Sequence, residues 1–151
     1  MTTTHKLGKK INFSFFIFHF SLLLMFTSVA SADFTRDNNT KIVTDNETGL
    51  QWQDDKNVTK TWQNAIKYCE ALTLGGYDDW RLPNRNEIYS IVDETQARPS
   101  ISPVFQFSSY KSYWSSTSCG DGAWVIRFSI GDQYTYHKIS NNHVSCVRAG
   151  Q

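Results

Sequence analysis

The sequence lacks an excess of charge of either sign, so its composition alone predicts no strongly charged binding partner. It contains 15 Lys and Arg residues against 14 Asp and Glu residues. Three of the lysines lie in the first 32 residues, so the rest of the chain carries 12 basic against 14 acidic residues. Net charge therefore gives no support for a general affinity for polyanions. A phosphate-binding glycine loop and a basic helix are also missing, which argues against nucleotide or nucleic-acid binding.

Cysteine is scarce, and the three cysteines are Cys69, Cys119 and Cys146. All three follow residue 32, in the part of the chain that we expect to be exported. In an oxidising compartment at least one disulfide is expected, and three single pairings are possible. Each pairing leaves one thiol over.

After residue 32 the chain has no long apolar run, whereas residues 11–29 form one directly behind Lys6, Lys9 and Lys10. The run ends on "VASA", with small residues at Ala30 and Ala32. This pattern predicts a signal peptide over residues 1–32 and one domain over residues 33–151. The alternative is an uncleaved membrane anchor, because the run is long for a signal peptide.

The first part of the domain predicts a hairpin and then a helix. Two β-prone runs, Ile42–Thr44 and Leu50–Gln53, flank a turn over Asn46–Gly49. Apolar residues at steps of three and four then predict an amphipathic helix that begins after Thr61 and ends at Gly75 or Gly76; they are Trp62, Ala65, Ile66, Cys69 and Leu72.

A second helix is predicted after Pro83, where Asn84 and Glu87 have the spacing of a capping box. Residues 97–112 contain two prolines and no sustained period, which indicates a long loop. Three strand-like stretches follow: "SYWSSTS", a hairpin around Ile130–Gln133, and "HVSCVRAG" as one last strand. The order of elements is typical of an α+β domain.

The stretch "GGYDDWRLPNRNE" between the helices is the most conspicuous candidate for a site. Oxygen ligands for calcium could come from Asp78, Asp79, Asn84 and Asn86, although no EF-hand spacing is present. The preferred interpretation is a structural turn in which Asp78 and Asp79 pair with Arg81 or Arg85.

Signals of catalysis are weak. Ser115 and Ser116 lack the glycine-flanked elbow of a nucleophilic serine. Cys119 could act with His137 or His143, yet sequence distance does not place them together. The two histidines have no second close ligand pair for zinc. No cofactor is predicted.

Several blocks resemble the Lcl C-terminal domain family of bacterial secreted or surface domains: "TGLQWQDD", "TWQNAIKYCEALTLGGYDDWRLPNRNEIYSIVD", "YWSSTS" and "CVRAGQ". Their order is the family's order, and they cover residues 48–151. "WRLPN…E" is also similar to a signature of the formylglycine-generating enzyme group. The resemblance implies a C-type-lectin-like α+β fold, with two helices flanking a small twisted antiparallel sheet and a long loop region.

The resemblance also implies roles for particular residues. A Cys69–Cys146 disulfide would tie the first helix to the last strand. The stretch around Trp80 becomes a joint between the helices, and eight residues are expected to be structural: Trp52, Trp62, Trp80, Arg81, Pro83, Asn84, Glu87 and Trp114. The calcium-binding sugar loops of lectins and the catalytic cysteine pair of the formylglycine enzymes are absent.

The function expected from the resemblance is a secreted, periplasmic or surface module that binds carbohydrate, including sulfated or anionic glycans, without catalysis. Aromatic rings stack on sugars and cations bind their anionic groups. The candidate ligand residues are Tyr110, Lys111, Arg127, Tyr134, Tyr136, His137 and Lys138. The competing interpretation makes Tyr134 and Tyr136 core residues. The alternatives in function are a formylglycine-type oxidase or thiol enzyme that uses Cys119, and a protein-binding envelope component that uses the loops between Glu94 and Gly122.

Overall fold

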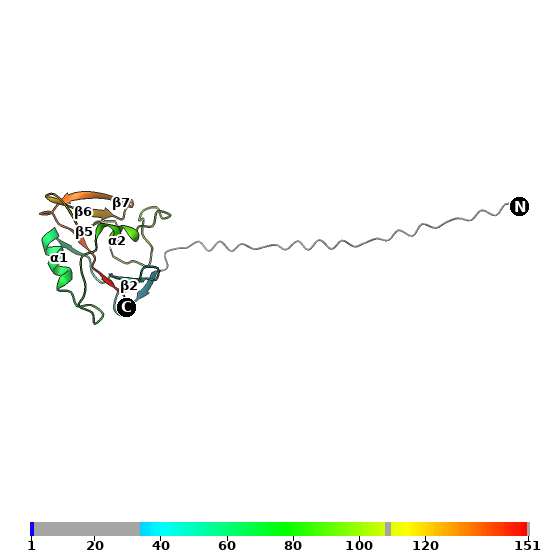
Figure 1. Cartoon of the computed structure of the whole chain (residues 1–151), viewed down its shortest axis with the longest axis horizontal. Helices are drawn as coiled ribbons and strands as arrows, with labels where there is room; N and C mark the ends of the chain where they lie inside the picture. Colours follow the sequence, from blue (N-terminus) through cyan, green and yellow to red (C-terminus); the bar gives the residue numbers. More distant parts are fainter. Residues whose placement is uncertain (2–33, 108–109, 151) are drawn as a thin grey trace.

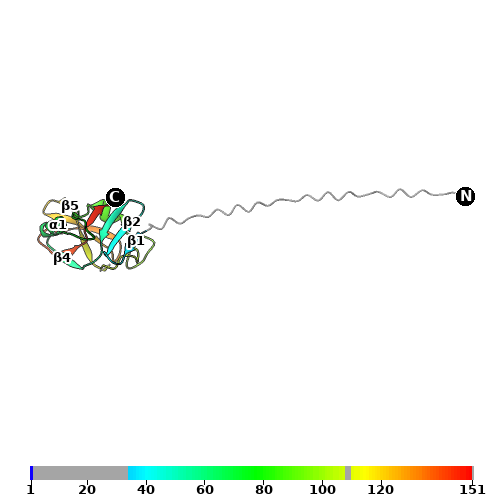
Figure 2. The same cartoon turned by 90° about the horizontal axis from the view of Figure 1, so that it is seen from below.

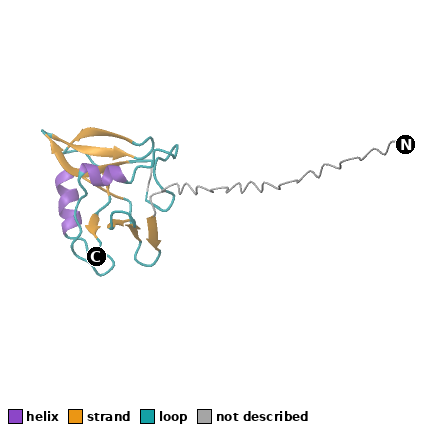
Figure 3. Ribbon diagram, turned by 45° about the vertical axis from the view of Figure 1, so that its right-hand side comes forward, coloured by secondary structure: helices purple, strands orange, loops and turns teal. Residues whose placement is uncertain are grey.

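The computed structural model describes Met1 and residues 34–107 and 110–150. The predicted signal peptide lies outside the described residues. Among the residues described, no helix is both long enough and apolar enough to span a membrane. Two β-sheets and two short helices form the folded part (Figures 1–3).

The smaller sheet is antiparallel and has the strand order β1-β2-β3-β9. Its strands are β1 (Phe34–Asp37), β2 (Ile42–Asp45), β3 (Leu50–Gln53) and β9 (Val147–Ala149). The predicted β2–β3 hairpin is confirmed. The Asp45 carboxylate accepts hydrogen bonds from the backbone N–H groups of Glu47 and Thr48 in its turn, and Gly49 has a φ of 74°, which a side chain would disfavour.

The larger sheet has the strand order β4-β8-β5-β6-β7. Its strands are β4 (Val58–Lys60), β5 (Ser112–Cys119), β6 (Gly122–Arg127), β7 (Asp132–His137) and β8 (Asn142–Val144). The predicted hairpin around Ile130–Gln133 is confirmed as β6–β7. Alternate residues point to opposite faces of a strand, and Val125 and Ile126 therefore belong to different hydrophobic clusters.

The first helix, α1 (Trp62–Glu70), begins after Thr61, as predicted, although the Thr61 side chain makes no capping hydrogen bond. The prediction that glycine ends this helix is wrong. The helix ends at Glu70 with Ala71 as its C-cap, and Gly75 and Gly76, both with positive φ, form a turn between Leu74 and Tyr77. Leu72 lies beyond the helix because the backbone N–H of Leu72 already bonds back to Cys69.

The second helix, α2 (Arg85–Ser90), has the predicted capping box. The Asn84 side chain accepts from the backbone N–H of Glu87 at 2.9 Å, and the Glu87 carboxylate accepts from the backbone N–H of Asn84 at 2.8 Å. The helix lies between the larger sheet and the smaller one (Figure 1), where Ile88 packs with Trp52 and Ile126.

The closing segment of the chain joins the two sheets. It was predicted as one strand, but it forms β8 in the larger sheet and β9 in the smaller one, with Ser145 and Cys146 between them. The predicted Cys69–Cys146 disulfide is confirmed, and both cysteines are fully buried. It therefore ties α1 to the crossing between the sheets.

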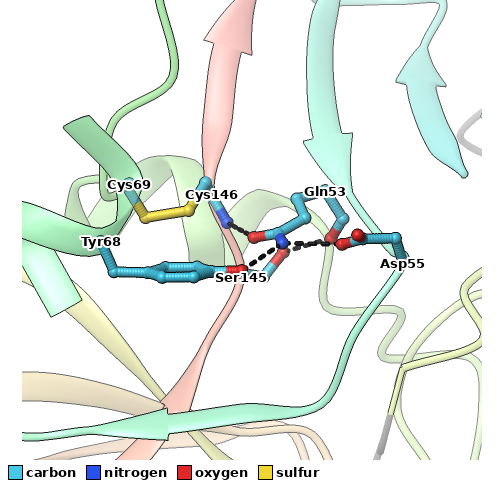
Figure 4. Close-up of a disulfide and its surroundings, with 6 residues drawn as sticks. All are labelled: Gln53, Asp55, Tyr68, Cys69, Ser145 and Cys146. Carbon is cyan, nitrogen blue, oxygen red and sulfur yellow. Dashed lines mark hydrogen bonds between the residues drawn. A yellow bond between two sulfur atoms is a disulfide. The ribbon is translucent and has the colours of Figure 1, made fainter. Parts of the chain in front are cut away.

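A buried glutamine holds this crossing from the other side (Figure 4). The Gln53 amide donates to Asp55 Oδ1 at 2.7 Å and lies 2.8 Å from the Tyr68 hydroxyl. Its carbonyl oxygen accepts from the backbone N–H of Cys146, while the Ser145 hydroxyl donates to the Gln53 main-chain oxygen. Buried polar groups are stable when they are paired in this way.

The predicted fold class, two helices flanking one small antiparallel sheet in a C-type-lectin-like arrangement, is wrong. The described chain is mainly β-structure in two separate sheets, and its helices span nine and six residues. The error arose because the strands of the smaller sheet are only three or four residues long. Such runs do not show from the sequence alone that β9 adds to β3.

Candidate functional site

The joint between the helices is built from the residues expected to be structural. Trp80 is 2% exposed and Leu82 is 3% exposed, while Pro83 is also buried. Arg81 forms two hydrogen bonds with the Glu87 carboxylate, at 2.7 and 2.6 Å. The Arg81 guanidinium lowers the pKa of Glu87 from its usual value, and the bond to Asn84 acts in the same direction. Of the other tryptophans named, Trp52 and Trp114 are fully buried and Trp62 is half-buried.

The acidic pair of this stretch has a partner that we did not predict. Asp79 accepts from Arg148 Nε at 2.6 Å, not from Arg81 or Arg85. The same guanidinium stacks on the Tyr77 ring at 3.6 Å, and the ion pair lowers the pKa of Asp79. Asp79 thus anchors the turn to β9, and the Asn84 oxygen caps α2. Within the described ranges no cluster of three His, Cys, Asp or Glu side chains could hold a metal ion.

The seven predicted ligand residues do not form one cluster. Alternation along β6 and β7 places Arg127, Tyr134 and Tyr136 on the face of the larger sheet that carries Trp114, and His137 on the opposite face. Lys138 follows β7, and Tyr110 and Lys111 precede β5. Arg127 pairs with Asp132, Val125 with Tyr134 and Ala123 with Tyr136, so these side chains share the Trp114 face. Lys138 lies on the same side, with Nζ 4.6 Å from the centre of the Trp62 ring.

Five residues on the Trp114 face form a connected polar and aromatic surface, which we call the tyrosine strip. The Arg127 guanidinium binds the Asp132 carboxylate through two hydrogen bonds and lies 5.3 Å from the centre of the Tyr134 ring. The strip consists of Ser112, Arg127, Asp132, Tyr134 and Tyr136.

The tyrosines of the strip meet edge to face, with ring centroids 6.0 Å apart. The hydroxyl groups of Tyr134 and Ser112 are 2.7 Å apart. Tyr134 is half-buried against the core cluster that contains Trp114, whereas Tyr136 is 44% exposed. The competing interpretation, in which both rings belong to the core, therefore holds in part for Tyr134 and does not hold for Tyr136.

Cations of the strip and its surroundings are already engaged. Asp132 binds Arg127, which raises the pKa of Arg127 and lowers that of Asp132. Lys138 Nζ donates to the Gly120 carbonyl at 2.8 Å, and His137 Nδ1 lies 3.2 Å from Asp121 Oδ2. An anionic group at these positions has to compete with a carboxylate or a carbonyl.

The remaining two predicted residues, Tyr110 and Lys111, lie in the connection before β5. Tyr110 is 63% exposed and donates its hydroxyl to the Arg98 carbonyl at 3.2 Å. Lys111 makes no hydrogen bond or ion pair to any residue that the structure describes. Its charge adds to burial, the larger cause, in lowering the pKa of His143.

Sequence reasoning missed a groove beside this connection, with a volume of about 410 Å³. Arg98 lines it and has a φ of 54°, in the left-handed region that few side chains adopt. The dipeptide Arg98–Pro99 marked a loop but gave no signal of the groove. Its lining residues are Val92, Glu94, Gln96, Ala97, Arg98, Ser100, Ile130 and Gly131.

Cys119 is a free, exposed thiol at the turn between β5 and β6. The histidine that we considered as its base, His137, is instead engaged with Asp121. The other candidate, His143, faces the Tyr113 ring at a centroid distance of 5.2 Å. The described part of the chain thus supplies no hydrogen-bonded base for this thiol.

The order of the blocks and their positions in the structure agree with the comparison against known families. The family model of the Lcl C-terminal domain matches residues 41–148. The chain belongs to this family, and the match extends from the start of β2 into β9. A search of curated proteins finds no match.

Proposed function

We propose that this protein is an exported, non-catalytic module that binds carbohydrate through the tyrosine strip. The observation that carries the proposal is the exposed Tyr136 ring beside a pre-ordered set of hydrogen-bonding groups. Sugar rings present CH groups that stack on aromatic faces, and their hydroxyl groups bind fixed donors and acceptors. Export is supported by the signal-like pattern of residues 1–32 and by the buried disulfide.

The strip offers both kinds of contact at once. Tyr136 provides a ring that is 44% exposed, and the Tyr134 ring supports its edge. Arg127 and Asp132 hold each other in place, with side chains 40% and 41% exposed. A sugar hydroxyl can donate to the Asp132 carboxylate and accept from Arg127 without the ordering of a long free side chain, which lowers the entropic cost of binding.

The pairing of Arg127 with Asp132 bears on the ligand class. Because the guanidinium is already neutralised by a carboxylate, the strip itself suits hydroxyl-rich sugars better than sulfated ones. An anionic glycan would gain its charge contacts at the connection before β5, where Lys111 and the Arg98 side chain have no ion-pair partner among the described residues.

Binding to a glycan array, followed by titration calorimetry with a captured oligosaccharide, tests this site. Tyr136→Ala removes the stacking surface, and we expect binding to fall by about fivefold, since aromatic contacts contribute about 1 kcal/mol. Arg127→Gln breaks the pair with Asp132 and is expected to weaken binding as well.

Two other variants make the result specific. Lys67→Ala removes an exposed charge on α1 away from the strip and should bind like the unchanged protein. Lys111→Ala reports on the connection before β5. Loss of binding in Lys111→Ala with full binding in Tyr136→Ala would reject the strip and move the site to the connection. No retained glycan on the array would reject the function.

A further inference from the structure

The outer edge of β7 is the feature of the fold that the proposed function leaves unexplained. β7 is the last strand of the larger sheet and pairs only with β6 among the described strands. Its central residues, Gln133 to Tyr136, include no charge, proline or glycine and are rich in β-prone side chains. Natural sheets usually protect such an edge, because its free N–H and C=O groups invite pairing with another chain.

The backbone groups that point outward can be assigned from one hydrogen bond. The backbone N–H of Lys138 donates to the Asp121 carbonyl at 3.2 Å, which makes Asp121 and Lys138 a hydrogen-bonded position of the ladder, although the Lys138 carbonyl accepts from the backbone N–H of Trp62. Bonded and non-bonded pairs alternate along antiparallel strands. Tyr136 and Tyr134 therefore bond to β6, while Thr135 and Gln133 direct their N–H and C=O groups toward the free edge.

The other sheet edges in the described ranges are shorter or covered. β4 spans three residues and β1 spans four. The outer side of β9 is covered by Arg81, whose backbone exchanges two hydrogen bonds with Val147, at 2.9 and 2.8 Å. With six residues, β7 is the longest open edge in the part of the molecule that the structure describes.

We propose that two copies of this chain pair through β7, antiparallel and about a two-fold axis at Thr135. This axis sets Thr135 opposite Thr135 and Gln133 opposite His137, so the outward N–H and C=O groups of both chains meet. It also sets Tyr134 opposite Tyr136, and it sets Asp132, which is bound to Arg127, opposite Lys138, so that a carboxylate and an ammonium group face each other at both ends. A change of the pairing register by two residues sets either Asp132 opposite Tyr136 or Tyr134 opposite Lys138. In both cases the charge match is lost.

The paired chains form one continuous sheet with their Trp114 faces on the same side, because a two-fold axis perpendicular to the sheet preserves its faces. The tyrosine strips of the two copies then lie next to each other. The pairing itself needs no ligand, so it can be tested independently of carbohydrate binding.

Sedimentation velocity of the purified protein from micromolar to millimolar concentration tests the pairing. We expect a reversible monomer–dimer equilibrium. Thr135→Lys and Thr135→Glu each set two like charges opposite each other at the axis, and each variant alone should be monomeric. An equimolar mixture of the two should form a heterodimer, because the charges are then opposite.

Thr59→Lys, which places the same charge on the exposed edge strand β4, is the matched control and should dimerise like the unchanged protein. Circular dichroism and thermal unfolding establish that each variant is folded. An unchanged protein that stays monomeric at every concentration would overturn the proposal. So would Thr135→Lys that dimerises as strongly as Thr59→Lys, or a mixture of the charge variants that remains monomeric.

Discussion

At the scale of single residues, Glu87 performs two tasks in the joint between the helices. Its carboxylate caps the backbone of Asn84 and binds Arg81, and its backbone N–H bonds to the Asn84 side chain. We expect Glu87→Ala to lower the free energy of unfolding by about 1–2 kcal/mol, the range for loss of a helix cap with a partly exposed ion pair. Urea unfolding measures this difference, and Glu70→Ala, an exposed position on α1, is the matched control.

The same residue predicts a dependence on pH. The pKa of Glu87 is lower in the folded protein than its usual 4.5. The folded state therefore binds fewer protons than the unfolded chain, and the stabilisation is complete above pH 4.5 and is lost as the pH falls through the folded pKa. The difference in stability between the unchanged protein and Glu87→Gln should shrink in acid. A difference that stays constant down to the lowest pH at which the protein folds would contradict this.

Contacts between residues a few positions apart could be predicted from the sequence. Contacts between residues that are far apart in the chain could not. Asn84 and Glu87 are three positions apart, which specifies a capping box locally. The partner of Asp79 is Arg148, which is 69 positions away, so no local pattern connects them. The tyrosine strip was predicted in part, because alternation places Tyr134 and Tyr136 on one face but does not reveal Ser112 or the pairing of Asp132 with Arg127.

At the scale of elements, the disulfide and the crossing between β8 and β9 hold the two sheets together. The Cys69–Cys146 bond spans a sequence separation of 77 residues. On the chain-entropy estimate, its loss through Cys69→Ser with Cys146→Ser costs about 4.5 kcal/mol. Chemical unfolding should show a loss of this size, while Cys119→Ser, which removes the free thiol, should leave stability unchanged. Equal effects of the two changes would contradict the assigned pairing.

Local elements were predicted better than their arrangement. The β2–β3 and β6–β7 hairpins are specified by turn residues between short β-prone runs. The closing segment contains a similar run without a break, yet it supplies one strand to each sheet. Only the positions of β3 and β4, with which β9 and β8 pair, explain the division. The family resemblance was correct, but the fold expected from it was not.

At the scale of the whole molecule, the larger sheet presents two surfaces along β7. The tyrosine strip lies on one face of the sheet, and the backbone groups of Gln133 and Thr135 lie at its edge. In the two proposals, carbohydrate would bind to the face and self-association would use the edge. Pairing of two copies would double the strips on one side, which raises the avidity for a repeating glycan without a new contact.

The most direct test of the strip as the binding site is a map of amide chemical-shift changes on titration with an oligosaccharide captured by the array. We predict that the largest changes fall on Arg127, Asp132, Tyr134 and Tyr136. Amides near Arg98, Tyr110 and Lys111 should shift less with a neutral sugar. Changes concentrated at Arg98, Tyr110 and Lys111, with the strands β6 and β7 unaffected, would contradict the account.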